Sequence, residues 1–156
     1  MAGAALAALA PRWQRAAERE REAEWLFRGR QIADALARYA SHSPAGSARR
    51  PQRLEQLLLD RRHDPPLQHL RRLYADPFTG ADDWVLLRDA DGGIRGLHSR
   101  SPQPLLRAPA PGVSLRPLAL DAAQASQAVL ARDGWFIPDS GALQAGARSM
   151  PRSSTR

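Results

Sequence analysis

Residues 24–40 read EWLFRGRQIADALARYA and hold a regular apolar pattern. Its members recur at intervals of four, three, four and three residues: Trp25, Gly29, Ile32, Leu36 and Tyr39. These intervals place them on one face of an α-helix. We therefore expect one long helix over residues 12–40, whose second half packs on a small domain.

The sequence before this stripe has a different character. Residues 14–24 are polar on nearly all sides of a helix, with arginine and glutamate interleaved, so they offer no apolar face to bury. Residues 1–10, MAGAALAALA, carry no charge, and Pro11 suits the first turn of a helix. A bilayer span needs about 20 apolar residues. Residues 1–11 are therefore either an Ala-rich helix start or the remnant of an apolar membrane or filament helix.

Shorter elements follow the long helix. Leucine-rich segments predict short helices at about 52–60 and 67–74. The sequence DPFTG, residues 76–80, has the chemistry of a turn, and DADGG at 89–93 suits the connection of a hairpin over about 84–99. The expected fold class is α+β, with a long N-terminal helix packed on short helices and a small antiparallel β-hairpin or sheet.

These elements predict a single hydrophobic core. We expect the following apolar side chains to meet in it: Trp25, Leu26, Ile32, Leu36, Leu54, Leu57, Leu73, Tyr74, Trp84, Leu86 and Ile94.

The composition changes after Ser101, where five prolines fall between residues 102 and 117. Proline removes backbone donors and favours an extended path. We expect residues 108–156 to form a largely disordered, Pro/Ala-rich tail, with a short helix near 121–132 capped by Asp121. The apolar run at 135–137, Trp-Phe-Ile, is expected to dock another protein.

Composition limits the function classes. The 156 residues suit one domain, and the absence of cysteine excludes disulfides and thiolate metal sites. The net charge is +7, yet all 23 basic residues are arginine, and asparagine is absent as well. That bias indicates a GC-rich genome. A basic nucleic-acid-binding module remains the alternative function, but aromatic residues do not interleave with the basic runs, and we expect no nucleic-acid partner.

Histidines and acids of the chain are conceivable metal ligands. One conceivable cluster comprises His63, His69, His98, Asp64 and Asp76, whose spacings match no standard motif. Asp89, Asp91 and Gly92 resemble the start of a calcium loop, but the remaining ligands of such a loop are missing. A hairpin turn is the preferred interpretation, so we expect no metal site and no cofactor.

Catalytic and phosphate-binding patterns are also weak. Ser99 and Ser101 lie near His98, but no glycine elbow or third member accompanies them. The pairs at 61–62 and 71–72 are arginines that either bind phosphate or, more commonly, pair with acids and backbone carbonyls. We expect no catalytic residues and no enzymatic activity.

Four segments together resemble pseudopilin-like proteins of the type II secretion group. They are EWLFRGRQIADAL at 24–36, LEQLLLD at 54–60, HLRRLYADPFTG at 69–80, and Trp84 followed by GGIRGLHSRS at 92–101. The resemblance covers about half of the chain and rests on the order of the motifs. It implies a pilin-like domain over residues 12–107 and a structural role in a filament-like assembly.

The resemblance also implies partners and a location. The partners are other pseudopilins, a prepilin peptidase and an inner-membrane assembly platform, and the location is the inner membrane with a periplasmic domain. The family begins with a short leader, a glycine cleavage site and an apolar helix. We therefore expect the reading frame upstream of Met1 to encode that start. Major pseudopilins bind calcium in a C-terminal loop, but the corresponding region here differs, so that ligand is not inferred.

Overall fold

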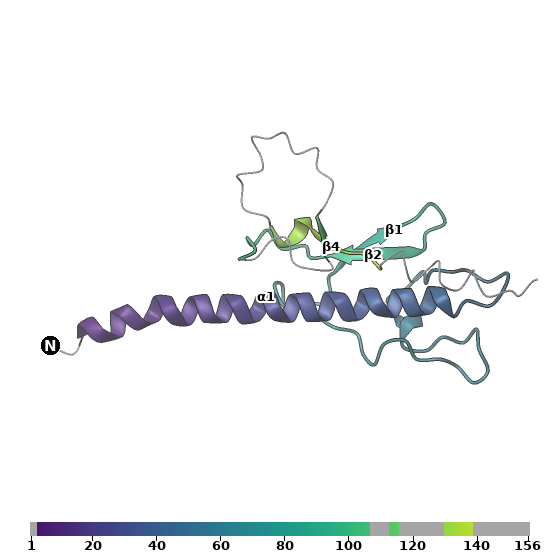
Figure 1. Ribbon diagram of the computed structural model, residues 1–156, viewed down its shortest axis with the longest axis horizontal. Coiled ribbons are helices and arrows are strands. Elements are labelled where there is room, and N and C mark those ends of the chain that lie inside the picture. Colours follow the sequence, from purple (N-terminus) through teal and green to yellow (C-terminus); the bar gives the residue numbers. More distant parts are fainter. Residues whose placement is uncertain (1–2, 107–112, 116–129, 139–156) are drawn as a thin grey trace, which may run out of the picture.

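The computed structural model describes the backbone of residues 3–106, 113–115 and 130–138, and side chains over residues 12–106, at 113 and over 130–138. The fold is α+β, with one long helix beside a small antiparallel sheet (Figure 1).

The helix α1 (Gly3–Ser41) extends well beyond the rest of the molecule at its N-terminal end (Figure 1). Its 39 residues correspond to about 58 Å at 1.5 Å per residue. The predicted C-terminal end of the helix is correct to within one residue, but the predicted start is wrong. Pro11 lies inside α1 and not in its first turn. Proline has no N–H to donate to the carbonyl of Ala7, and the good helix formers around it offset that local loss.

Within the described residues, four short strands form one antiparallel sheet in the order β1-β2-β4-β3. The strands are β1 (Val85–Arg88), β2 (Ile94–His98), β3 (Ser114–Leu115) and β4 (Gly134–Phe136). Strands β2 and β4 lie at the centre and pack on α1. The sheet lies along one side of the second half of the helix (Figure 1).

The predicted hairpin is observed as β1 and β2. Val85 lies opposite His98, and the register shifts between Leu87 and Arg88. The connection is closed by a hydrogen bond from the Asp89 N–H to the Gly93 carbonyl, 2.9 Å long. Gly92 has a φ of 79°, which glycine adopts without steric cost.

The two short helices predicted at 52–60 and 67–74 are wrong. The first segment forms only a 3-10 turn, η1 (Leu54–Leu57), and the second is not helical. The Leu57 carbonyl accepts hydrogen bonds from the N–H groups of His69 and Leu70, at 2.9 and 2.8 Å, and Asp60 pairs with Leu67 as an isolated bridge. These non-local bonds replace the i to i−4 bonds of a helix.

The predicted disordered tail is also wrong for the parts that the structure describes. Residues 113–115 contain β3, and residues 130–138 contain β4 and a 3-10 turn, η2 (Ala131–Asp133). Residues 121–129, most of the helix predicted near 121–132, lie outside the described residues. The apolar run at 135–137 belongs to the protein's own sheet, because Leu97 and His98 of β2 pair with Phe136 and Trp135.

One hydrophobic core joins α1, the sheet and η1. All eleven predicted core residues belong to it, either buried or packed against its buried members. Trp84, 8% exposed, donates its indole N–H to the Tyr74 carbonyl at 2.7 Å. The prediction missed Leu97 and Phe136, both fully buried. The Phe136 ring fills the space that a side chain at Gly29 would need, so the stripe contains glycine where the sheet approaches most closely.

Candidate functional site

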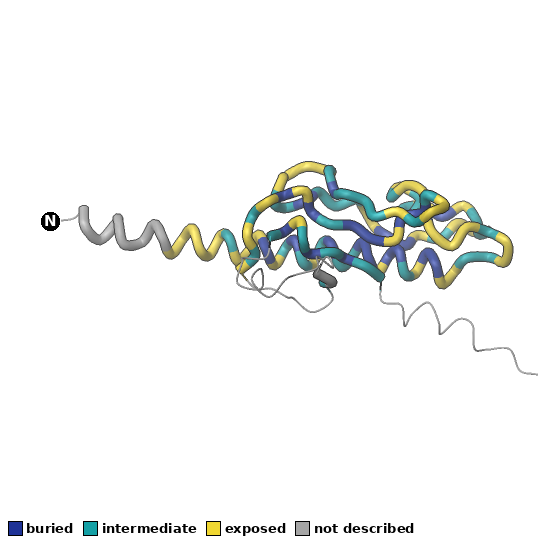
Figure 2. Tube along the Cα trace, turned by 90° about the horizontal axis from the view of Figure 1, so that it is seen from above, coloured by how far each residue is buried: buried dark blue, intermediate teal, exposed yellow. Residues whose placement is uncertain are grey.

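The projecting part of α1 is the most distinctive surface of the molecule. Residues 12–21 are exposed except for the half-buried Glu18 (Figure 2). Burial begins at Glu22, which is only 5% exposed and accepts a hydrogen bond from the Leu106 N–H at 2.7 Å. From Trp25 onward, every turn of the helix contributes side chains to the core. Among the residues of α1 whose burial is described, the domain therefore covers those from about Glu22 to the end of the helix.

The projecting segment carries both charged and apolar groups. Trp13 is 72% exposed, the largest exposed fraction among the large apolar side chains described. The Arg19 guanidinium donates a hydrogen bond to the Arg15 carbonyl at 3.2 Å. In the part of the chain that the structure describes, Trp13, Arg15 and Arg19 are exposed, so they are available to another molecule.

Arginines fasten the covered half of α1 to the loops beside it. Arg28 pairs with Glu24 at 2.7 Å and donates to the Ala75 carbonyl at 2.8 Å. Arg38 donates to the His69 carbonyl at 2.8 Å. Burying polar groups is tolerated when such bonds are made. These two contacts hold the segment between His69 and Ala75 along the helix without any regular secondary structure.

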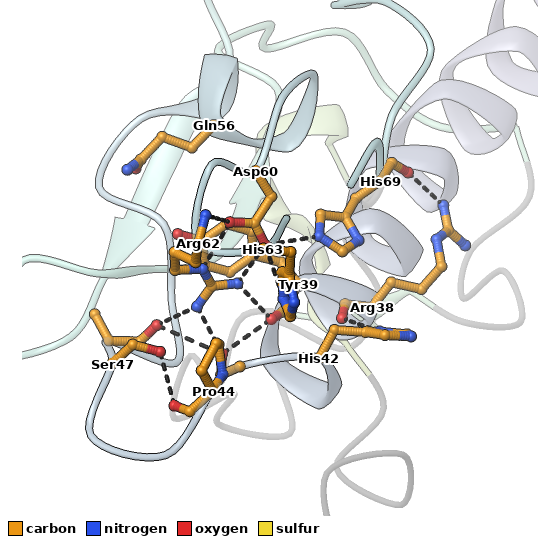
Figure 3. A network of polar contacts seen from close by, with 12 residues as sticks. Arg38, Tyr39, His42, Pro44, Ser47, Gln56, Asp60, Arg62, His63 and His69 are labelled. Atoms are coloured by element: carbon orange, nitrogen blue, oxygen red, sulfur yellow. Dashed lines mark hydrogen bonds and ion pairs between the residues drawn. The ribbon is translucent and has the colours of Figure 1, made fainter. Parts of the chain in front are cut away.

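A buried polar cluster surrounds Asp60 (Figure 3). The Asp60 carboxylate accepts bonds from the Arg62 guanidinium, at 2.8 and 2.7 Å, and contacts His69 Nε2 at 3.0 Å. Arg62 also donates to the Tyr39 carbonyl at 3.0 Å and stacks 3.5 Å from the centre of the Tyr39 ring. The hydrogen bonds from Arg62 hold the pKa of Asp60 well below its ordinary value. The cluster connects the C-terminal end of α1 to residues 60–69.

A second buried carboxylate, Asp76, organises the predicted turn. Its Oδ1 accepts the Phe78 N–H at 2.9 Å, and its Oδ2 accepts the Ser99 hydroxyl at the end of β2. Burial raises the pKa of Asp76, and the hydrogen bond from Ser99 opposes that rise. The predicted local hydrogen bonding of Asp76 is confirmed, and the bond to Ser99 attaches the turn to the hairpin.

Of the residues considered as metal ligands, the structure brings together His63 and His69, whose Nε2 atoms lie 3.8 and 3.0 Å from the Asp60 carboxylate. His69 contacts Asp60, whereas His98 stacks on Trp135 and Asp76 bonds Ser99. Over the described residues there is no group of three or more histidines and acids able to hold a metal ion.

The residues considered as a calcium loop belong to the hairpin turn. Asp89 accepts the N–H groups of Asp91 and Gly93, at 3.1 and 2.7 Å, and pairs with Arg50 at 2.8 Å. Its oxygens are therefore used within the protein.

The serines near His98 do not form a nucleophile and base. The Ser99 hydroxyl donates to Asp76, and His98 Nδ1 faces the Ser99 carbonyl at 2.7 Å. The Ser101 hydroxyl oxygen accepts a hydrogen bond from the Gln103 N–H at 3.2 Å. The functions of these side chains in the structure are to close turns and to hold the end of β2.

The arginine pairs behave differently from each other. In the first pair, Arg62 is held by Asp60 and by backbone carbonyls, while Arg61 is exposed. In the second pair, both Arg71 and Arg72 are exposed. Beside the 76–80 turn it is Arg28 that bonds a backbone carbonyl, that of Ala75, a role that the sequence pattern did not reveal.

Among the described residues, no helix combines the length and the apolarity that a membrane crossing requires. Comparison of the chain with protein-family models, with curated proteins and with solved structures found no match.

Proposed function

We propose that this protein is a pseudopilin-like structural subunit of a type II secretion system or a related pilus-like assembly, which associates with other subunits through α1. One observation carries the proposal: α1 is continuous over 39 residues, yet among its residues from 12 onward, whose side chains the structure describes, continuous burial begins only at about Glu22. A helix that is polar nearly all round and leaves its domain has no folding role in the isolated protein. Its exposed side chains are accounted for if other subunits surround it.

The distribution of side chains along α1 supports this role. The uncharged sequence of residues 1–10 precedes the polar zone, and a one-sided zone follows it. Such an order suits a subunit whose apolar end lies in a membrane or filament interior and whose far end carries a domain. A pilin-like fold is part of the proposal, since the second half of α1 is covered by an antiparallel sheet.

The proposed role is structural and needs no catalysis. The partners that we propose are other pseudopilins, the prepilin peptidase that would process the chain, and an inner-membrane assembly platform. The proposed location is the inner membrane, with the domain in the periplasm.

Site-specific cross-linking tests the proposal. Because the chain has no cysteine, a single introduced cysteine reports only its own position. Ala16→Cys places a thiol on the projecting helix, and Ala90→Cys places one on the exposed hairpin turn as the control. The full-length protein is expressed from its own locus with single-cysteine pseudopilins of the same cell, and the cells are oxidised with copper phenanthroline.

The expected result is cross-linking of Ala16→Cys to a second copy or to a co-expressed pseudopilin, with little product from Ala90→Cys. Equal cross-linking at both positions, or none at position 16 and at its neighbour Ala17, would contradict helix-mediated association. Tight binding of the purified chain to nucleic acid, weakened steeply by salt, would favour the alternative function instead.

A further inference from the structure

A groove of about 250 Å³ lies between α1 and the loop of residues 67–74. Its polar and aromatic walls include Gln31, Arg38, Gln68, His69, Arg71 and Tyr74. One wall of the groove is thus α1, and the other is a loop that hydrogen bonds from arginines of α1 hold against the helix.

The arginines of the groove have no carboxylate beside them in its lining. Among the described residues, none of those that line the groove is acidic. Across the described part of the chain, the guanidinium groups of Arg38, Arg71 and Arg72 form no ion pair with a carboxylate. Arg38 is oriented by its bond to the His69 carbonyl, which Figure 3 shows. By contrast, Arg62 on the neighbouring segment is neutralised by Asp60.

An exposed aromatic side chain flanks the same groove. Phe27 lies one helical turn before Gln31 and is 51% exposed. Its ring meets Tyr74 edge-on, with 6.3 Å between the ring centroids. The guanidinium carbon of Arg72 lies 5.1 Å from the Tyr74 centroid. Exposed aromatic residues next to arginines are characteristic of the energetic centres of protein interfaces.

We propose that this groove binds a short acidic segment of a partner protein. Arg38 and Arg71 would receive carboxylates, since guanidinium groups bind them through paired hydrogen bonds. The amides of Gln31 and Gln68 would bond the backbone of the segment, and Phe27 would contact an apolar side chain next to its acids. The inference goes beyond the proposed function, because none of these residues belongs to the projecting segment of α1, residues 12–21.

Acidic residues on α1 favour a short protein segment over a nucleic acid. Glu24 and Asp34 lie on either side of Phe27 and Gln31 along the helix, and the side chain of Glu24 remains 43% exposed although it pairs with Arg28. A phosphate backbone running along α1 would meet both of these negative charges, whereas a short segment at the groove would meet only the nearer one, Asp34, which lies between Gln31 and Arg38 on the same face of α1. The aromatic contact also distinguishes the site from one for a small inorganic anion.

Fluorescence anisotropy of the full chain tests the inference. The probe is a fluorescein-labelled peptide of three glutamates flanked by leucines. We expect saturable binding that Arg71→Glu weakens by at least about tenfold and Phe27→Ala by about fivefold. The matched control is Arg95→Glu, which makes the same charge change at an exposed arginine of β2 and is expected to weaken binding by less than about twofold.

Four outcomes would overturn the inference. The first is no saturable binding by the native chain, and the second is an equal loss with Arg95→Glu and Arg71→Glu. The third is insensitivity to Phe27→Ala together with displacement of the peptide by an equal concentration of inorganic phosphate, which means a simple anion site. The fourth is tighter binding of a ten-nucleotide oligothymidylate with the same response to Arg71→Glu, which means a nucleic-acid site. Thermal melting of each variant verifies that the fold is retained. The cross-linking of Ala16→Cys tests the proposed function independently, so its outcome does not depend on peptide binding at the groove.

Discussion

Gly29 and Phe136 pack closely in the core. The ring of Phe136 occupies the position of a Cβ at Gly29, so Gly29→Ala forces the ring or the strand to move. We expect this change to lower the free energy of unfolding by about 1–3 kcal/mol, although Gly→Ala at an open helix position stabilises by about 1 kcal/mol. Urea denaturation measures the effect.

A double variant isolates this contact. With Phe136→Leu as the background, Gly29→Ala should cost less than it does in the native chain, because leucine fills less of the space above the helix. The same cost in both backgrounds would show that the two residues are not coupled.

Asp60 gives the protein a defined response to acid. Its folded-state pKa is lowered by the Arg62 hydrogen bonds, so its stabilising contribution is complete above about pH 4, the ordinary range for aspartate. That contribution is lost as the pH falls toward the folded-state pKa. Asp60→Asn should therefore cost about 3 kcal/mol at pH 7 and progressively less below pH 4, as measured by denaturation across this range. An equal cost at pH 7 and pH 2 would contradict this assignment. Asp64→Asn, at an exposed position, is the control.

Two tryptophans provide a matched comparison of burial. Trp84 is 8% exposed and hydrogen-bonded, while Trp13 is 72% exposed. Trp84→Ala should cost about 3–5 kcal/mol, and Trp13→Ala should change the stability of the isolated chain by no more than about 0.5 kcal/mol. Thermal and urea denaturation measure both. Similar values for the two variants would mean that Trp84 is not part of the core in solution.

At the scale of elements, the turn at 76–80 acts as a structural connector. Asp76→Ala leaves the Phe78 N–H and the Ser99 hydroxyl without their acceptor, which should cost about 1–3 kcal/mol. Elemental analysis of the purified protein should show no metal lost with the substitution. A stoichiometric metal present in the native chain and absent from Asp76→Ala would identify the turn as a binding site. Asp82→Ala, at an exposed neighbour, is the control.

The sequence predicted elements well where local pattern and tertiary contact agree. The stripe from Trp25 to Tyr39 and the hairpin around Gly92 are of this kind. The segments 52–60 and 67–74 were predicted incorrectly, because their leucines mimic a helical period while Leu57 and Asp60 bond across the chain. Local patterns contain no information on such non-local bonds.

The site was less predictable than the fold. Strand β4 has only three residues and follows a proline-rich region, so its pairing with β2 has no periodic signal. The groove at Arg38 and Arg71 depends on a loop that has no regular structure. Phe27 contacts Tyr74, a residue 47 positions away in the chain. Only tertiary folding brings the two rings together, so no local pattern predicts the contact.

At the scale of the whole molecule, α1 sets the dimensions. If the helix is continuous in solution, residues 16 and 34 lie about 27 Å apart along its axis. Spin labels on Ala16→Cys and Asp34→Cys, introduced together into the cysteine-free chain, should therefore give a narrow distance distribution near that value, allowing for the label arms. A second pair at positions 34 and 90, both on the covered domain, is the control. A distribution broad for the first pair and narrow for the second would show that the projecting segment bends or unwinds.

The contact of Phe136 with Gly29 and Trp25 sets an order of events during biosynthesis. Trp25 meets Phe136 edge-on with 4.7 Å between the centroids, although about 110 residues separate them in the chain, a long loop to close. During synthesis, α1 leaves the ribosome before β2, and β2 leaves before β4. The part of the stripe around Gly29 therefore stays incompletely covered until β4 follows, longer than the part that β2 covers.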